Sequence, residues 1–286
     1  MKMKEKVFCY FHNDDMDGWS SSAVVQRKYP NAEFYGYNYE PIIKLVEGYD
    51  KVFMVDCSVS SSDMQYLMEN NKEFIWIDHH AKKIWDTYKE IGKDIKGLRD
   101  TDSEHSACVL TWVYLYPDEP IPEVLLLIED MDIWKWKLKD TDAVNIALFN
   151  DHRDRKQLNM FMDNWSIAKK VVISNGNLYI KMRDDQVDFM VSNLIQKITF
   201  HGLRAGVVNS PIHTSFVGHE MLKRNEDIDI AIIWYAIDDT IRVSLRSKGY
   251  VDVSKIAGLY GGGGHKHASG FTLTTSVVLN EFIGDG

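Results

Sequence analysis

The sequence has 286 residues, and its 45% hydrophobic, 26% charged and 12% aromatic content is typical of a globular chain and excludes intrinsic disorder. At roughly 150 residues per domain, this length predicts two domains. Lys and Arg number 33 and Asp and Glu number 42, so the formal net charge is −9, which argues against a protein that tracks a long phosphate backbone but not against one that holds a short nucleotide in a metal pocket.

The first half of the chain alternates strand-like and helix-like segments. Short apolar runs predict strands at 7–11, 51–56 and 73–78, and apolar periodicity predicts helices at 19–29, 63–70, 107–116 and 122–130. Strands that alternate with helices indicate an α/β fold with a parallel sheet covered on both faces.

The second half begins with a polar, irregular stretch at 150–177 around a short helix at 158–169, and helical spacing predicts a connecting helix that ends near residue 200. Strands are then expected at 204–208, 230–235 and 241–245, and a helix at 252–259. We therefore predict a first domain over 1–175, a connecting helix over 176–200 and a smaller domain over 201–286. This last domain is nearly neutral, since 8 basic residues minus 9 acidic ones from position 201 onward give −1.

Three cysteines, Cys9, Cys57 and Cys108, stand far apart and form no CxxC pair. Disulfides and a zinc–thiolate site are therefore not expected, and we interpret the cysteines as reduced core thiols of a cytoplasmic protein. The apolar run before His12 is too short for a signal peptide, and the longest apolar stretch, 228–237, is far shorter than the ~20 residues of a membrane helix. A soluble protein with no membrane partner is expected.

Each of the three predicted strands of the first half stops at a polar residue, namely His12, Asp56 or Asp78. Because the carboxyl ends of parallel strands share one edge of a sheet, we expect these residues to converge on one site. The segment from His12 to Gly18 adds Asp14, Asp15 and Asp17, which would repel one another strongly without a cation. It is equally consistent with an Asx-rich turn in which Asp17 is a helix N-cap.

Asp78 is followed by His79 and His80, and the apolar run before residue 130 is followed by Asp130 and Asp132. Each of these, like Asp56, is explained singly as a cap or core residue. Together, carboxylates and imidazoles without thiolates favour Mn²⁺, with Mg²⁺, Co²⁺ or Fe²⁺ as alternatives. The carboxylates are numerous enough for two ions that share one aspartate, an arrangement used in phosphate-ester hydrolysis.

A run of four glycines, 261–264, precedes His265, and strand 241–245 and its end carry Arg242 and Arg246. Glycines let a backbone approach a ligand and present its N–H groups to a phosphate, and an arginine can clamp a phosphate through two hydrogen bonds. A flexible hairpin and solvent-exposed arginines are the alternatives. Trp134 and Trp136 are consistent with base stacking, although packing is the more frequent use of large aromatic residues.

The ordered set of His12, Asp15, Asp17, Asp56, Asp78-His79-His80 and Asp130 resembles the four motifs of the DHH phosphoesterase superfamily. The segment 261–270, GGGGHKHASG, resembles the GGGH signature of the associated DHHA1 domain. The resemblance implies an N-terminal parallel-sheet DHH domain and a smaller α/β DHHA1 domain with a mixed sheet. It is nearest to the oligoribonuclease and nucleotide phosphodiesterase branch of nanoRNase-like enzymes.

The resemblance also implies a role for each site residue. His12 and Asp15 would hold one ion, Asp17, His79 and Asp130 the other, and Asp56 would bridge them. His80 would contact the scissile phosphate and Asp78 would orient the histidines, so that Asp56, Asp78 and His80 are the expected catalytic residues. The substrate binders would be His80, Arg246, Gly262, Gly263, Gly264 and His265.

The expected activity is Mn²⁺-dependent hydrolysis of short 5′-phosphorylated oligonucleotides, or of related small nucleotides, by a hydroxide that bridges two metal ions. The alternatives are a phosphatase of 3′-phosphoadenosine 5′-phosphate, a cyclic nucleotide phosphodiesterase and a non-catalytic nucleotide-binding scaffold. Binding to long duplexes is not expected. The sequence leaves the oligomeric state open, a homodimer included.

Overall fold

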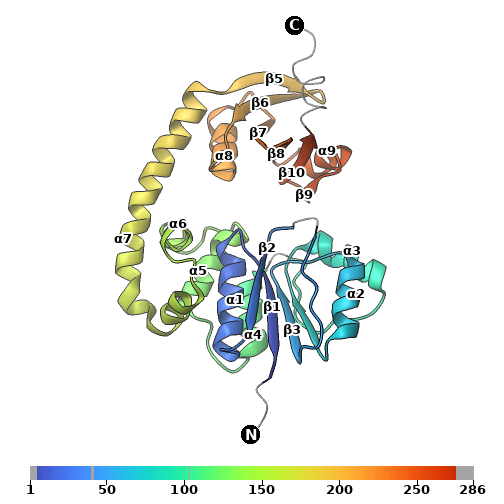
Figure 1. Cartoon of the computed structure of the whole chain (residues 1–286). Coiled ribbons are helices and arrows are strands. Elements are labelled where there is room, and N and C mark those ends of the chain that lie inside the picture. The colour runs from blue at the N-terminus through green and yellow to red at the C-terminus, as the bar shows by residue number, and fades with distance from the viewer. Residues whose placement is uncertain (1–4, 40–41, 103, 275–286) are drawn as a thin grey trace. The chain divides into compact units, whose positions relative to one another are not determined.

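The structure is a computed structural model of the whole chain (Figure 1), and it describes residues 5–39, 42–102 and 104–274. The outer ends of the first and last predicted domains, at residues 1 and 286, lie outside these ranges. The chain divides into two compact units, Met1–Ile180 and Lys181–Gly286. We describe each unit by itself.

The N-terminal unit is built on a four-stranded sheet in which every pair of neighbours is parallel, in the order β2-β1-β3-β4. The strands are β1 (Val7–His12), β2 (Glu33–Tyr37), β3 (Lys51–Val55) and β4 (Phe74–Ile77). Nearly every residue of the central β1 and β3 is buried, because helices cover both faces of the sheet. The predicted parallel sheet is confirmed, and β2 is a strand that the sequence analysis missed.

Alternate residues of each strand enter two different cores. Val7, Cys9 and Phe11 of β1 pack with five helices, whereas Phe8 and Tyr10 pack with two others, as the period of two along a strand requires. Figure 1 shows these helices on the two sides of the sheet. The first group is α1 (Met16–Lys28), α4 (Ala107–Leu115), α5 (Glu123–Asp132), α6 (Thr141–Asp151) and α7 (Arg155–Asn193), and the second is α2 (Ser61–Asn70) and α3 (Ala81–Ile91).

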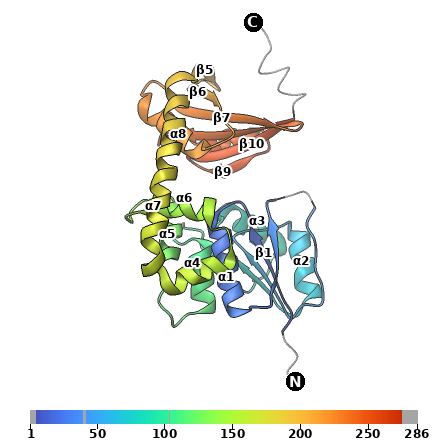
Figure 2. The same ribbon diagram turned by 60° about the vertical axis from the view of Figure 1, so that its left-hand side comes forward.

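The C-terminal unit contains a six-stranded sheet in the order β5-β6-β7-β8-β10-β9, which Figure 2 shows in yellow to red. Only β6 and β7 pair in parallel, so the predicted mixed sheet is confirmed. The strands are β5 (Gln196–Phe200), β6 (Leu203–Asn209), β7 (Ile230–Ile237), β8 (Thr240–Ser247), β9 (Gly263–His265) and β10 (Ala268–Thr274). Helix α8 (Thr214–Arg224) packs in one core of this unit and α9 (Val253–Leu259) in the other.

Helix α7 (Arg155–Asn193) corrects the prediction for the middle of the chain. The stretch expected to be irregular around a short helix is helical from residue 155, with non-helical dihedral angles at Asn164 (φ −130°, ψ 36°). The connecting helix expected to reach residue 200 ends at Asn193, and residues 196–200 form β5. Residues 165–193 form an uninterrupted helix of eight turns.

The three cysteines are buried and unpaired, and burial raises the pKa of each thiol, which favours the inert core role predicted for them. Within the ranges that the structure describes, no helix combines the length and the apolar character needed to cross a membrane.

We predict that Gly176→Ala destabilises the N-terminal unit by about 1–3 kcal/mol, because a Cβ at this position of α7 would lie 1.9 Å from the carbonyl oxygen of Ala143. Chemical denaturation of the full chain measures the change. Gly258→Ala in α9 is the matched control, since nothing lies within 4 Å of its added Cβ. A Gly176→Ala protein as stable as the Gly258→Ala protein would show that α7 and α6 do not pack as closely as described.

Candidate metal centre

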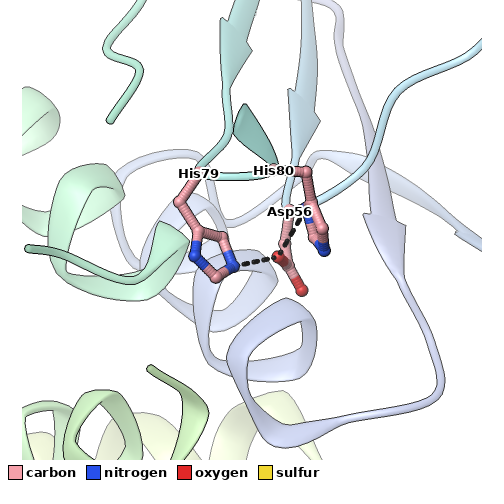
Figure 3. A group of neighbouring side chains, drawn as sticks. All are labelled: Asp56, His79 and His80. Carbon is pink, nitrogen blue, oxygen red and sulfur yellow. Dashed lines mark ion pairs between the residues drawn. The ribbon is translucent and has the colours of Figure 1, made fainter. Parts of the chain in front are cut away.

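Three parallel strands deliver the residues of the candidate centre to one edge of the sheet. His12 is the last residue of β1, Asp56 directly follows β3, and Asp78 directly follows β4. This convergence follows from parallel pairing, which places all carboxyl ends on the same side. Figure 3 shows His79 and His80 beside the carboxylate of Asp56.

The first group of potential ligands is His12, Asp15 and Asp56. His12 Nδ1 lies 2.7 Å from Asp15 Oδ2 and 3.5 Å from Asp56 Oδ2. Asp15 is the N-cap of α1, where its Oδ1 accepts a hydrogen bond of 2.9 Å from the Gly18 N–H, so only its other oxygen faces the group. The alternative reading with Asp17 as N-cap is therefore wrong.

The second group is Asp17, His79 and Asp132. His79 Nε2 lies 3.3 Å from Asp132 Oδ2 and 3.6 Å from Asp17 Oδ2. The buried Asp17 carboxylate accepts hydrogen bonds from the backbone N–H groups of Ala107 (2.8 Å) and Cys108 (2.7 Å) at the start of α4. The N-terminus of that helix stabilises the negative charge of Asp17.

Asp56 connects the two groups. Its Oδ2 faces His12, while its Oδ1 lies 3.3 Å from His79 Nε2 and 3.9 Å from His80 Nδ1 (Figure 3). Both oxygens are buried and make no hydrogen bond to any described residue. Asp56 also has a left-handed backbone (φ 57°), a strained conformation that clusters at functional sites.

The structure brings Asp132, rather than the expected Asp130, to His79. The Asp130 carboxylate instead accepts three hydrogen bonds from the following loop, donated by Lys137 N, Leu138 N and Thr141 Oγ1 at 2.9, 3.0 and 2.6 Å. Asp130 thus holds the loop that connects α5 to α6, and its oxygens are already satisfied. Asp132 Oδ2 is buried without a hydrogen bond among the described residues.

Asp78 orients the neighbouring histidine. Its Oδ1 lies 2.7 Å from His80 Nδ1 and also accepts hydrogen bonds from the backbone N–H groups of His79 (2.8 Å) and His80 (3.2 Å). Burial opposes ionisation of Asp78, but the charge of His80 and its hydrogen bond hold the pKa of Asp78 below the ordinary value. Because Nδ1 of His80 is engaged by Asp78, its Nε2 is the nitrogen left to meet a ligand.

The electrostatics of the centre favour cations. Burial, reinforced by the charges of Asp15 and Asp17, raises the pKa of Asp56 well above its usual range, and burial and Asp17 do the same for Asp132. For His12, burial is outweighed by the neighbouring carboxylates of Asp15 and Asp56, which raise its pKa to about 11. Buried carboxylates without partners, together with imidazoles and without thiolates, fit divalent ions that accept oxygen and nitrogen ligands.

Tyr39 is a site residue that the sequence analysis missed. Its ring centroid lies 5.7 Å from that of His12, in an edge-on arrangement, and its backbone is left-handed (φ 61°). Burial, followed by the nearby Cys57 and Asp78, raises its pKa, so the phenol stays protonated. Tyr39 follows β2, and because that strand was not predicted, no sequence signal placed Tyr39 at the edge of the sheet.

The C-terminal unit has its own cavity of about 510 Å³. Among the residues predicted to bind substrate, Gly262 lines it, and Arg242 rather than Arg246 supplies a guanidinium group. Arg246 donates to Ser215 Oγ (2.7 Å) and to the Leu245 carbonyl (2.9 Å). The residues that line the cavity include Pro211, Thr214, Tyr235, Arg242, Ser244, Tyr260, Gly261 and Gly262.

The glycine run is a hairpin rather than an open loop. Gly263, Gly264 and His265 form β9, which pairs with β10, and these three residues are not among those that line the cavity. A Cβ at Gly262 would lie 2.1 Å from the carbonyl oxygen of Gly270, so close backbone packing requires glycine there. After this hairpin turn, His267 Nδ1 and Ser247 Oγ share a hydrogen bond of 3.2 Å.

Trp134 and Trp136 pack edge to face with ring centroids 4.9 Å apart, and both have left-handed backbones. They lie in the loop that Asp130 holds, since Trp136 N also donates to the Asp130 carbonyl oxygen. Mutual packing of the two rings agrees with the more frequent role of large aromatic residues.

Two sequence families match this chain. Residues 6–128 match the DHH family, N-terminal domain, and residues 208–284 match the DHHA1 domain. The two matches appear in the order that the sequence motifs predict, and the first contains the strands that carry His12, Asp56 and Asp78.

Two curated relatives are similar over most of this chain. It is 29% identical over 227 residues to the uncharacterized protein R106 of Acanthamoeba polyphaga mimivirus, covering 78% of this chain and 53% of that protein. It is 26% identical over 245 residues to the oligoribonuclease NrnB of Bacillus subtilis (strain 168), covering 80% and 60%. The chain thus spans little more than half of the length of these relatives.

Solved structures share the fold. An exopolyphosphatase-related protein of Bacteroides fragilis has a TM-score of 0.53 at 16% identity, with 94% of this chain and 86% of that chain covered. A pGpG-specific phosphodiesterase, PggH, of Vibrio cholerae has a TM-score of 0.50 at 12% identity, with 99% and 100% covered.

We predict that Asp132→Asn weakens Mn²⁺ binding at least about tenfold, because it removes a ligand charge, whereas Asp130→Asn leaves affinity within about twofold. Asp130→Asn should instead lower stability by about 2 kcal/mol, since it weakens the three hydrogen bonds of the loop. Titration calorimetry and thermal unfolding of both variants separate the two effects. If Asp130→Asn weakened Mn²⁺ binding and Asp132→Asn did not, Asp130 would be the metal ligand.

We predict that Mn²⁺ affinity rises with pH between about 6 and 8. The His12 pKa is raised to about 11, so this imidazole is protonated throughout that window and must lose its proton before it can bind an ion. Each proton displaced on binding steepens the increase by about one logarithmic unit per pH unit. Calorimetry in buffers of different ionisation enthalpy counts the protons, and His12→Asn should release fewer. An affinity independent of pH would show that Mn²⁺ binding displaces no proton from His12.

Proposed function

We propose that this chain, in which residues 6–128 match the DHH family and residues 208–284 the DHHA1 domain, is a two-metal phosphodiesterase of short 5′-phosphorylated oligonucleotides or related small nucleotides. The observation that carries the proposal is the Asp56 carboxylate, whose two buried oxygens face two different groups of potential ligands. A carboxylate with this environment suits a bridge between two cations.

We assign His12, Asp15 and Asp56 to the first ion, and Asp17, Asp56, His79 and Asp132 to the second. Oxygen and imidazole donors favour Mn²⁺, with Mg²⁺, Co²⁺ and Fe²⁺ as alternatives. When bound, such a pair of ions lowers the pKa of a water molecule and offsets the charge that develops on the phosphoryl group.

The other residues bind and orient the substrate. Burial opposes protonation of His80, but the charge of Asp78 and its hydrogen bond raise the His80 pKa, which favours the protonated imidazole. Its Nδ1 is fixed on Asp78, and its Nε2 can donate a hydrogen bond to a phosphate oxygen. The protonated Tyr39 phenol beside His12 offers a second hydrogen-bond donor.

Short substrates are favoured by charge and by the cavity. The net charge of −9 opposes long polyanions, whereas a cavity of about 510 Å³ is of the size that takes a small ligand. Arg242 would bind a substrate phosphate there, a role for which Arg246 and His265 were the expected residues. The similarity to the oligoribonuclease NrnB supports the same substrate class.

We predict that, with Mn²⁺, the protein hydrolyses di- to tetranucleotides at least about 10²-fold faster than long single strands, measured as kcat/KM. The panel should include pGpG, 3′-phosphoadenosine 5′-phosphate and cyclic dinucleotides, which represent the alternative activities. Asp56→Asn should lower kcat at least about 10³-fold together with the metal content. His80→Gln should lower kcat about 10²-fold at unchanged metal content.

Full activity of Asp56→Asn would exclude the shared-ligand assignment. A protein that binds two ions but hydrolyses no member of the panel would instead support the nucleotide-binding scaffold.

A further inference from the structure

We propose that helix α7 is a docking surface for a second copy of this chain, which pairs with it in antiparallel orientation about a two-fold axis beside Leu178. Five exposed apolar side chains form this surface, which we call the α7 seam: Ile167, Val171, Leu178, Met182 and Phe189. Each exposes 59–78% of its surface. The proposal concerns assembly and is independent of the proposed reaction.

The spacing of the seam residues keeps them on one face of the helix. Ile167, Leu178 and Phe189 are eleven residues apart, as are Val171 and Met182. An eleven-residue repeat corresponds to ~3.67 residues per turn, close to the 3.6 of a straight helix, so the stripe does not drift around α7. At ~1.5 Å per residue, the seam is about 33 Å long. It begins beyond Asn164, where α7 is regular.

The opposite face of α7 is already covered by this chain. Trp165, Val172, Val187 and Val191 are at most 7% exposed and belong to the cores of the protein. Gly176, on the same side, lies against the Ala143 carbonyl. A helix that packs in a single-chain protein has one apolar stripe and a polar opposite face, whereas α7 has a second apolar stripe that its own chain leaves exposed.

The charges of Lys170 and Asp185 favour a second copy of this chain as the partner, and they favour its antiparallel orientation. In antiparallel pairing about Leu178, Val171 of one copy meets Asp185 of the other, and the neighbouring Lys170 reaches that carboxylate. Lys170 and Asp185 make no ion pair with any residue that the structure describes, so each can pair across the interface. A parallel pair would instead place Asp185 against Asp185 on the seam, which like charges disfavour.

The seam is also self-complementary in shape and polarity. The same two-fold axis sets Ile167 against Phe189, Ser174 against Met182, and Leu178 against its own copy. Each contact away from the axis therefore occurs twice, as in the isologous interface of a two-fold dimer. A second copy would cover the apolar stripe and would also pair with the Asp185 carboxylate. A second copy of this chain is therefore the partner that fits the α7 seam.

Light scattering coupled to gel filtration tests the proposal on the full chain over a range of concentrations. The expected mass is twice the 33.1 kDa of one chain. Leu178→Glu, which sets two carboxylates face to face at the axis, should weaken association at least about 100-fold. Trp85→Glu is the matched control, because Trp85 is 62% exposed on α3, away from the seam, and its dimer should persist.

Cross-linking with a short bis-maleimide tests the orientation. Leu178→Cys should give a covalent dimer, whereas Phe189→Cys alone should not, because its two copies would stand about 33 Å apart along the helices. The three native cysteines are buried and should not react. Reversal of Lys170 to Glu should weaken the dimer, and adding Asp185→Lys to it should restore association.

Three results would overturn the proposal. The first is a monomeric mass at every concentration, which would leave the seam to another protein. The second is a dimer that Leu178→Glu leaves intact while circular dichroism shows the variant folded. The third is cross-linking of Phe189→Cys as efficient as that of Leu178→Cys, which would indicate a parallel pair.

Discussion

Repulsion among four carboxylates, those of Asp56 and of the neighbouring Asp15, Asp17 and Asp132, is the constraint on which the site and its supporting structure depend. Asp15 and Asp17 are compensated by the chain itself, the first by His12 and the Gly18 N–H and the second by the start of α4. Asp56 and Asp132 have buried oxygens with no hydrogen bond among the described residues. Because an unpaired buried carboxylate costs stability, its retention is best explained by a cation that binds there.

The sequence predicts most of this site because parallel strands deliver their last residues to one edge. It does not resolve Asp130 from Asp132, since both follow the same apolar run and only the three-dimensional course of residues 137–141 shows which carboxylate that loop uses. Tyr39 is missed for a different reason. Strand β2 is largely half-exposed and lacks a clear apolar pattern, so its end could not be located.

The fold is predicted best where the apolar residues of a segment follow a single clear pattern. Strands β1, β3 and β4 are continuous apolar runs between covering helices, and the mixed sheet of the C-terminal unit was expected from the DHHA1 resemblance. The continuity of helix α7, of which two separate pieces were predicted, escapes prediction because apolar residues occupy two opposite faces, as Trp165 and Ile167 illustrate, so no single amphipathic stripe stands out. Gly176 lowers the helical propensity further, and only packing against Ala143 explains its presence.

The acidity of the chain is concentrated where it has a chemical use. From residue 201 onward 8 basic and 9 acidic residues nearly cancel, so eight of the nine net negative charges lie in the first 200 residues. Those 200 residues include the carboxylates around Asp56, whereas Arg242 is among the residues that line the cavity of the C-terminal unit. Two divalent ions would offset four of the negative charges. The remaining acidity still opposes a long polyanion, because such a polymer would extend beyond the two sites that can attract phosphate.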